Sequence, residues 1–130
     1  MANMFDIERI EEKQSFINYS LEEQYTGQKW IDGKKIYQKT LKIDKLPVHA
    51  VDLSSLNLAT VIKIDGTFCD PVSNNIIPCL FFAISGRHDD VNIQILPSAS
   101  GEMTLRIGAS SDKSMYTENY ITLLYTRKEV

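Results

Sequence analysis

Histidine and cysteine are the side chains of this chain best suited to catalysis or metal binding, and its 130 residues hold two of each. A serine or cysteine nucleophile needs a base within hydrogen-bond reach. His49 follows Leu46-Pro47-Val48 in a predicted connector with no nucleophile near it, and His88 lies in a polar segment. The sequence therefore predicts no catalytic residues, no enzyme activity and no cofactor.

The segment around His88 is Gly86-Arg87-His88-Asp89-Asp90. Consecutive side chains of an extended chain point to opposite sides, so three adjacent ligand-type residues rarely converge on one metal ion. The sequence predicts a solvated loop and no metal site. Exposed loops on a rigid scaffold commonly carry binding residues. The predicted ligand-binding residues of this loop are Arg87, His88, Asp89 and Asp90.

Cys69 and Cys79 flank the turn-forming segment Asp70-Pro71-Val72-Ser73-Asn74-Asn75. A hairpin centred near Asn74 would place the cysteines directly opposite each other, with Cα atoms about 4.5 Å apart at a non-hydrogen-bonded pair. That separation is at the lower end of the disulfide range. A chain without an export signal favours two free thiols, so both states stay open. Neither cysteine has the CxxC spacing typical of zinc or redox sites.

Trp30 precedes Asp32-Gly33, the dipeptide most typical of a two-residue type I′ hairpin. In that register Trp30 and Tyr37 would be diagonal neighbours on one face. One interpretation is that the Trp30 ring covers the core beside Tyr37. The alternative makes Trp30 a ligand-binding residue, stacking sugars on a platform shared with Tyr25 and Tyr37. The expected cross-strand pairs are Ile31 with Lys34, Trp30 with Lys35, and Gln28 with Tyr37.

Five lysines follow this turn and alternate with apolar side chains, which predicts a solvated strand face; binding of an anionic surface is the alternative. The whole chain has 14 Lys and Arg against 17 Asp and Glu, a formal charge of −3. This is the wrong sign for a domain that binds many nucleic-acid phosphates, so no nucleic-acid partner is predicted. The five lysines are Lys34, Lys35, Lys39, Lys42 and Lys45.

Apolar residues recur with a period of two in short runs separated by Gly, Pro, Ser and Asn, and no 3.6-residue apolar stripe is long enough for a globular helix. This pattern predicts an all-β fold, an antiparallel, jelly-roll-like β-sandwich of about seven to nine strands. The sandwich would span residues 19–130, after an N-terminal arm or short helix at residues 1–18. The runs lie at residues 58–64, 80–84, 91–95, 103–107 and 121–125.

The start of the chain, Met1 to Glu8, is acidic where a secretory signal is basic, and no long apolar segment follows it. The longest apolar run, Ile76 to Ile84, is interrupted by Pro78 and is about half the length of a bilayer-spanning helix. We therefore expect no signal peptide and no membrane insertion.

Two motifs lie near the ends of the predicted sandwich. The first is Tyr19-Ser20-Leu21-Glu22-Glu23, continued by Trp30-Ile31-Asp32-Gly33-Lys34 and Ile36-Tyr37-Gln38-Lys39-Thr40. The second is Asn119-Tyr120-Ile121-Thr122-Leu123-Leu124-Tyr125-Thr126. In this order they resemble a module of tail-fibre and minor structural proteins of tailed bacteriophages and prophages.

This resemblance implies a non-enzymatic structural and host-recognition module of a phage tail, assembled in the bacterial cytoplasm. Its implied partners are a host cell-surface glycan or protein, other tail proteins, and further copies of itself, with a homotrimer favoured. The alternative is a bacterial carbohydrate-binding domain outside a virion. Binding would use exposed loops, here Gly86 to Asp90 and Ser110 to Glu118, and several copies would multiply the affinity.

Overall fold

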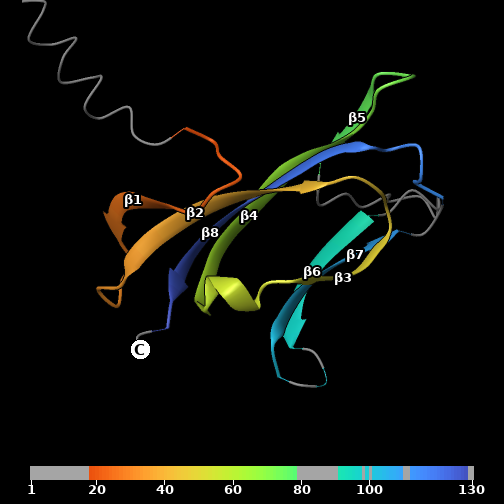
Figure 1. Ribbon diagram of the computed structural model, residues 1–130. Helices are drawn as coiled ribbons and strands as arrows, with labels where there is room; N and C mark the ends of the chain where they lie inside the picture. Colours follow the sequence, from red (N-terminus) through yellow and green to blue (C-terminus); the bar gives the residue numbers. More distant parts are fainter. Residues whose placement is uncertain (1–17, 79–90, 98, 100, 110–111, 129–130) are drawn as a thin grey trace, which may run out of the picture.

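The computed structural model describes residues 18–78, 91–97, 99, 101–109 and 112–128 (Figure 1). Residues 1–17, which hold nearly all of the predicted arm, and residues 79–90 lie outside the described part. The described elements are β1 (Gln24–Lys29), β2 (Lys35–Ile43), β3 (Val48–Asp52), the 3-10 helix η1 (Ser54–Leu56), β4 (Leu58–Asp70), β5 (Asn75–Pro78), β6 (Val91–Pro97), β7 (Met103–Ala109) and β8 (Glu118–Arg127).

The strands form two antiparallel sheets, which confirms the predicted all-β sandwich. The larger sheet has the order β1-β2-β8-β4-β5 and the smaller one the order β3-β7-β6. Figure 1 shows the smaller sheet crossing one side of the larger sheet, while the β1–β2 hairpin extends beyond it. The chain leaves the larger sheet after β2, forms β3, and returns through η1 to β4.

Strand β8 is the central strand of the larger sheet, and its alternation explains the core. Asn119, Ile121, Leu123 and Tyr125 are fully buried, while Tyr120 between them is exposed. The apolar members pack in one cluster with Val91, Ile93, Leu105 and Ile107 of the smaller sheet. Burial of one such Leu or Ile side chain contributes about 2 kcal/mol. The period-two runs at 58–64, 91–95, 103–107 and 121–125 are therefore confirmed as strands, and the run at 80–84 lies outside the described residues.

Gly66 allows β4 to approach β8 closely. Its φ is +155°, and a Cβ built at this position would lie 2.1 Å from the Tyr120 carbonyl oxygen and 2.9 Å from the Ile121 Cα. Backbone cannot yield as a flexible side chain does, so only glycine fits here. The hollow described below lies over this close contact.

The turn between β1 and β2 differs from the predicted two-residue type I′ turn. The Trp30 N–H donates to the Lys34 carbonyl at 2.8 Å and the Gly33 N–H donates to the Trp30 carbonyl at 2.9 Å, which encloses a three-residue loop. Only Gly33 in this loop has a positive φ, +84°. A three-residue loop with one left-handed glycine is the next commonest hairpin connection. The Asp32 carboxylate stabilises it by accepting the Lys34 N–H at 3.0 Å.

This loop changes the cross-strand pairs. Lys29 lies opposite Lys35 and Tyr25 opposite Tyr37, with an irregularity between the two pairs. Gly27, at φ +83°, lies in that irregularity and gives the β1 strand its bulge. The predicted cross-strand pairs were therefore wrong. The three-residue loop and the bulge both shift the register of β1 against β2, and the dipeptide Asp32-Gly33 predicts neither shift.

The predicted opposition of Cys69 and Cys79 was also wrong. Strand β4 pairs with β5 so that Cys69 lies opposite Ile76, and Cys69 is a free thiol. The turn is shorter than expected because the Asn74 N–H donates to the Asp70 carbonyl at 2.8 Å. Asn74 itself takes a left-handed φ of +61°. Cys79 lies outside the described residues.

Candidate functional site

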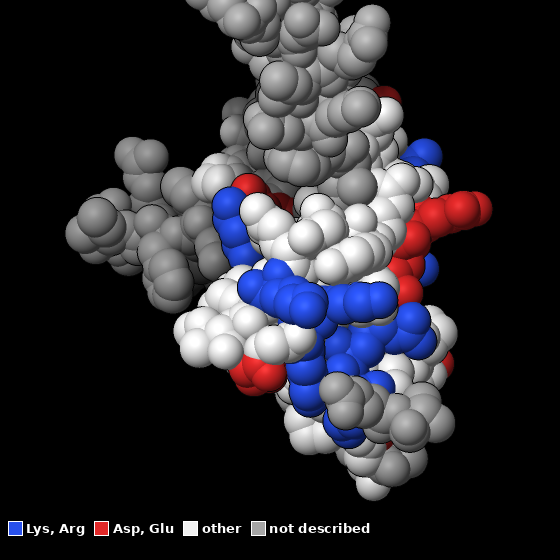
Figure 2. Space-filling model, turned by 90° about the vertical axis from the view of Figure 1, so that its left-hand side faces the viewer, with Lys and Arg blue, Asp and Glu red and all other residues white. Residues whose placement is uncertain are grey.

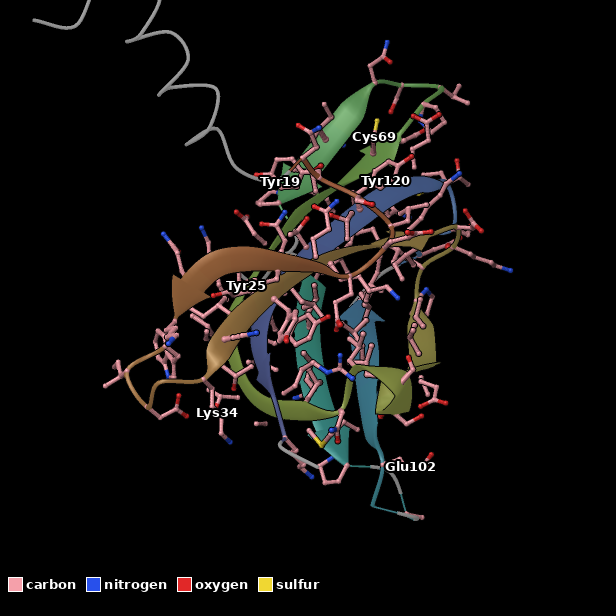
Figure 3. The ribbon with its side chains drawn as sticks, turned by 60° about the vertical axis from the view of Figure 1, so that its left-hand side comes forward. Tyr19, Tyr25, Lys34, Cys69, Glu102 and Tyr120 are labelled. Atoms are coloured by element: carbon pink, nitrogen blue, oxygen red, sulfur yellow. The ribbon has the colours of Figure 1, made fainter. Side chains whose placement is uncertain are left out.

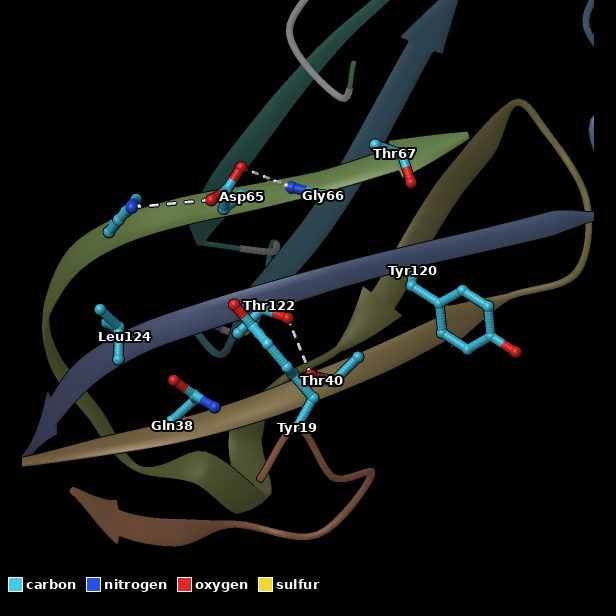
Figure 4. Close-up of a pocket in the computed structure, with 10 residues that line it drawn as sticks. Tyr19, Gln38, Thr40, Asp65, Gly66, Thr67, Tyr120, Thr122 and Leu124 are labelled. Atoms are coloured by element: carbon cyan, nitrogen blue, oxygen red, sulfur yellow. Dashed lines mark hydrogen bonds and ion pairs between the residues drawn. The ribbon is translucent and has the colours of Figure 1, made fainter. Parts of the chain in front are cut away.

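The outer face of the larger sheet, turned away from the smaller sheet, carries a hollow of about 410 Å³ (Figure 4). Strands β2, β4 and β8 form its floor, and the segment before β1 supplies part of its rim. We call it the sheet hollow. The lining residues are Tyr19, Gln38, Thr40, Lys63, Asp65, Gly66, Thr67, Tyr120, Thr122 and Leu124.

Strand register explains why these residues meet. Side chains of a strand alternate between its faces, so the residues between the buried positions of β8 all reach the outer face. The register then aligns them in three rows across the sheet, and the middle row carries two hydroxyls and a carboxylate. The rows are Lys63–Leu124–Gln38, Asp65–Thr122–Thr40 and Thr67–Tyr120.

Every residue of the middle row carries a hydrogen-bonding side chain. The Thr40 and Thr122 hydroxyl oxygens lie 2.8 Å apart, and one donates to the other. Asp65 accepts the Gly66 N–H at 2.9 Å through Oδ1, while its Oδ2 lies 3.6 Å from the Lys63 ammonium. Each hydroxyl and carboxylate oxygen has capacity for a further hydrogen bond. The floor therefore offers both donors and acceptors to a ligand.

Two tyrosines stand at the rim of the sheet hollow. Tyr19 is 78% exposed and Tyr120 is 44% exposed, and Figure 3 shows their side chains on the same end of the sheet. Tyr120 is fixed by the central strand β8. Tyr19 is held through its neighbour Ser20, whose carbonyl accepts the Thr40 N–H at 2.9 Å. An exposed aromatic ring combines an apolar face with a polar tip and suits stacking against a partly apolar ligand.

The opposite face of the hairpin end carries a ladder of tyrosines. Tyr37 lies between Tyr25 and Tyr125, with ring centroids 5.9 Å and 6.2 Å apart. The Tyr125 hydroxyl donates to Glu23, which also accepts a 2.8 Å hydrogen bond from Arg127. Burial, reinforced by this hydrogen bond to a carboxylate, raises the pKa of Tyr125. The phenol therefore stays protonated well above neutral pH.

Of the five site residues predicted from the sequence, one is described by the structure and four lie outside the described residues. Arg87, His88, Asp89 and Asp90 are outside the described residues. Trp30 is half-buried in the hairpin loop and does not line the sheet hollow. The rings that contact Tyr37 in the described part of the chain are Tyr25 and Tyr125. A ligand-binding role for Trp30 stays a prediction.

The segment from Ser110 to Glu118 is described from residue 112 and packs partly onto the core. Tyr116 is buried, and its hydroxyl accepts a hydrogen bond from the Asn75 amide at 2.8 Å. The Asn119 amide donates to the carbonyls of Tyr116 and Ile43 at 2.7 and 2.9 Å. These contacts make this stretch a cover for one end of the core. His49, predicted in a connector, lies in β3.

Sequence reasoning missed the residues of the sheet hollow as a site. The signal that could have found them is the outer half of the β8 alternation, Tyr120-Thr122-Leu124, which places an aromatic ring and a hydroxyl on one face. That alternation does not reveal which residues of β2 and β4 share its rows. Thr40 and Thr122 are 82 positions apart in the chain.

Among the described residues, no group of three or more His, Cys, Asp or Glu side chains is placed to hold a metal ion. Nor does the described part contain a helix of the length and apolarity needed to cross a membrane. No family model matches the chain, and searches of curated proteins and of solved structures gave no match.

Proposed function

We propose that this protein is a non-enzymatic host-recognition module that binds a cell-surface glycan in the sheet hollow. The observation that carries the proposal is the combination at this one place of two exposed tyrosines with a floor of hydroxyl, amide, carboxylate and ammonium groups.

A saccharide presents apolar C–H faces and a rim of hydroxyls, which are the complements of this surface. The rings of Tyr19 and Tyr120 offer faces for stacking. The Thr40, Thr122 and Asp65 oxygens can accept hydroxyl protons, and Gln38 can both donate and accept. Strands hold these groups more rigidly than loops would, which lowers the entropy lost on binding.

The phage-tail setting rests on the resemblance of the two terminal motifs. In that setting the module works beside other tail proteins and as several copies, with a homotrimer as the proposed state. A shallow, open site binds one sugar chain weakly, and several linked copies raise the overall avidity without any new contact. The host glycan is thus recognised by the assembled tail.

The second candidate is a bacterial carbohydrate-binding domain outside a virion, because the sheet hollow would serve it equally well. Light scattering combined with size-exclusion chromatography separates the two. A stable trimer supports the tail module, and a monomer supports the appended domain.

An array of uncharged glycans tests the binding function. Tyr120→Ala should abolish the signals of the wild-type protein. Tyr25→Ala is the matched control, because Tyr25 is 41% exposed but lies on the opposite face of the sheet. Circular dichroism checks that both variants fold. An array without hits, or hits that survive both Tyr19→Ala and Tyr120→Ala in folded protein, would contradict the proposal.

A further inference from the structure

A second concavity, of about 400 Å³, lies where the β1–β2 loop meets the end of β8. We call it the basic groove. Figure 2 shows Lys and Arg side chains gathered on this end of the molecule. Five of its lining residues are cationic and none is acidic, although the whole chain has a charge of −3. The lining residues are Lys29, Gly33, Lys34, Lys35, Tyr37, Asn57, Arg127 and Lys128.

Backbone contacts hold the cations together. Lys29 and Lys35 are direct cross-strand partners, and Lys34 follows the left-handed Gly33 of the hairpin loop. At the other side, the Lys128 N–H donates to the Asn57 carbonyl at 2.8 Å, and the Asn57 amide donates to the Lys128 carbonyl at 2.9 Å. The fold thus keeps like charges close together. Their repulsion raises the free energy of the folded state, and a bound anion would reduce that repulsion.

Carboxylates neutralise this cluster only in part. Glu23 pairs with Arg127 at 2.8 Å. Lys29, Lys34 and Lys128 form no ion pair with any other residue in the described ranges. Two lysines outside the groove differ, since Lys42 and Lys63 lie 3.9 and 3.6 Å from Asp44 and Asp65.

The available cations are ammonium groups, which act as point charges and do not demand a planar, bidentate partner. Such a set fits anionic groups spaced along a flexible chain. The lining contains no exposed aliphatic side chain that could anchor a protein partner. The aromatic residue of the lining is Tyr37, and its ring is already flanked by Arg127, 5.6 Å from the ring centre, and by the rings of Tyr25 and Tyr125. The lining therefore offers no bare ring for stacking the bases of single-stranded nucleic acid.

We infer that the basic groove binds an acidic polysaccharide, a saccharide chain that carries carboxylate, sulfate or phosphate groups. This site is separate from the sheet hollow. Tyr37 of the groove and Gln38 of the hollow are neighbours in β2, and consecutive residues of a strand face opposite sides of the sheet. The two binding activities should therefore be lost independently.

The test uses the full chain and a fluorescein-labelled heparin oligosaccharide, followed by fluorescence anisotropy at low salt. The double variant Lys34→Glu/Lys35→Glu should weaken binding about tenfold or more, and raising the salt concentration should weaken wild-type binding. The matched control is Lys42→Glu/Lys45→Glu, which changes the net charge equally at the other end of β2 and should bind nearly as wild type. Lys34→Ala/Lys128→Ala is the milder second variant, for use if charge reversal prevents folding.

Other results would overturn the inference. These are no heparin binding by the wild-type protein, an equal loss in the groove and control variants, or tighter binding of a single-stranded oligonucleotide or polyglutamate of matched charge. Tyr120→Ala distinguishes the two proposals, because it should remove glycan-array signals while heparin binding persists. If the glycan array gives no hits, the heparin experiment still tests the basic groove independently.

Discussion

The sheet hollow and the basic groove are made from alternate residues of the same strand. Gln38 and Thr40 face the hollow, whereas Lys35 and Tyr37 face the groove. The hollow is a patch of pleated sheet with paired charges and hydroxyls. The groove exists because the hairpin extends past the smaller sheet, which leaves the core-side face of that end uncovered (Figure 1). A strand can therefore present two chemically different surfaces where the smaller sheet does not cover its core-side face.

The largest difference in stability between the two surfaces is expected when their glycines are replaced. Gly66 lines the hollow and Gly33 lines the groove. Gly66→Ala forces a Cβ into the β8 backbone and should lower the free energy of unfolding by about 3 kcal/mol. Gly33→Ala has open space around it and meets only the strain of its left-handed φ, so about 1 kcal/mol is expected. Urea denaturation measures both. Equal losses would show that β4 and β8 can separate at no great cost.

A smaller difference in stability is expected when one hydroxyl is removed near each surface. Tyr125→Phe removes a buried donor to the Glu23 carboxylate beneath the groove and should cost about 2 kcal/mol. Thr40→Val removes one hydroxyl of the part-buried Thr40–Thr122 pair and should cost about 1 kcal/mol. Thermal or urea unfolding at pH 7 compares the two variants. A larger loss for Thr40→Val would make the floor of the hollow the more important polar cluster for stability.

The same tyrosine predicts a response to alkali. Because the pKa of Tyr125 is raised in the fold, the folded state keeps a proton that the unfolded chain loses near pH 10. The stabilisation it gives is complete below that pH and decreases as the pH rises further. The free energy of unfolding, measured by urea denaturation from pH 8 to 11, should fall more steeply for wild type than for Tyr125→Phe. Parallel curves would contradict the assignment.

The smallest effect lies at the β4–β5 turn, beyond the hollow, and responds to acid. The Ser73 hydroxyl, with the Val72 and Ser73 N–H groups, lowers the pKa of Asp70. Stabilisation from this carboxylate is present above its ordinary pKa of about 3.9 and is lost as the pH falls through the lowered value. Ser73→Ala should bring the pKa of Asp70 back toward the ordinary one, as measured by NMR titration. No change would mean that the backbone donors alone set it.

The period of two was enough to predict most of the fold. In β8 it identified Ile121, Leu123 and Tyr125 as one buried side, because burial on one face leaves a pattern in the sequence itself. Registers were not predictable in the same way. Asp32-Gly33 suits both two- and three-residue loops, and the choice depends on the bulge at Gly27 and the pairing of Tyr25 with Tyr37. Neither can be read from the turn residues.

The candidate sites were harder to predict for a related reason. Sequence reasoning favoured loops and Trp30, where polar or aromatic residues are adjacent in the chain. The sheet hollow instead depends on rows across strands, and the basic groove joins Lys34 with Lys128 from opposite ends of the described sequence. Of the five lysines predicted to share a face, only Lys34 and Lys35 line the groove.

The two aromatic walls of the sheet hollow are held very differently. Tyr120 belongs to a strand paired on both sides, whereas in the described part of the chain the segment carrying Tyr19 is joined to β2 by one backbone hydrogen bond, between Ser20 and Thr40. Local opening has a lower free energy where few such contacts must break. The Tyr120 side of the hollow would thus select the ligand, while the Tyr19 side adapts to the thickness of the ligand. Deuterium uptake at the Thr40 amide would report how tightly the site is closed.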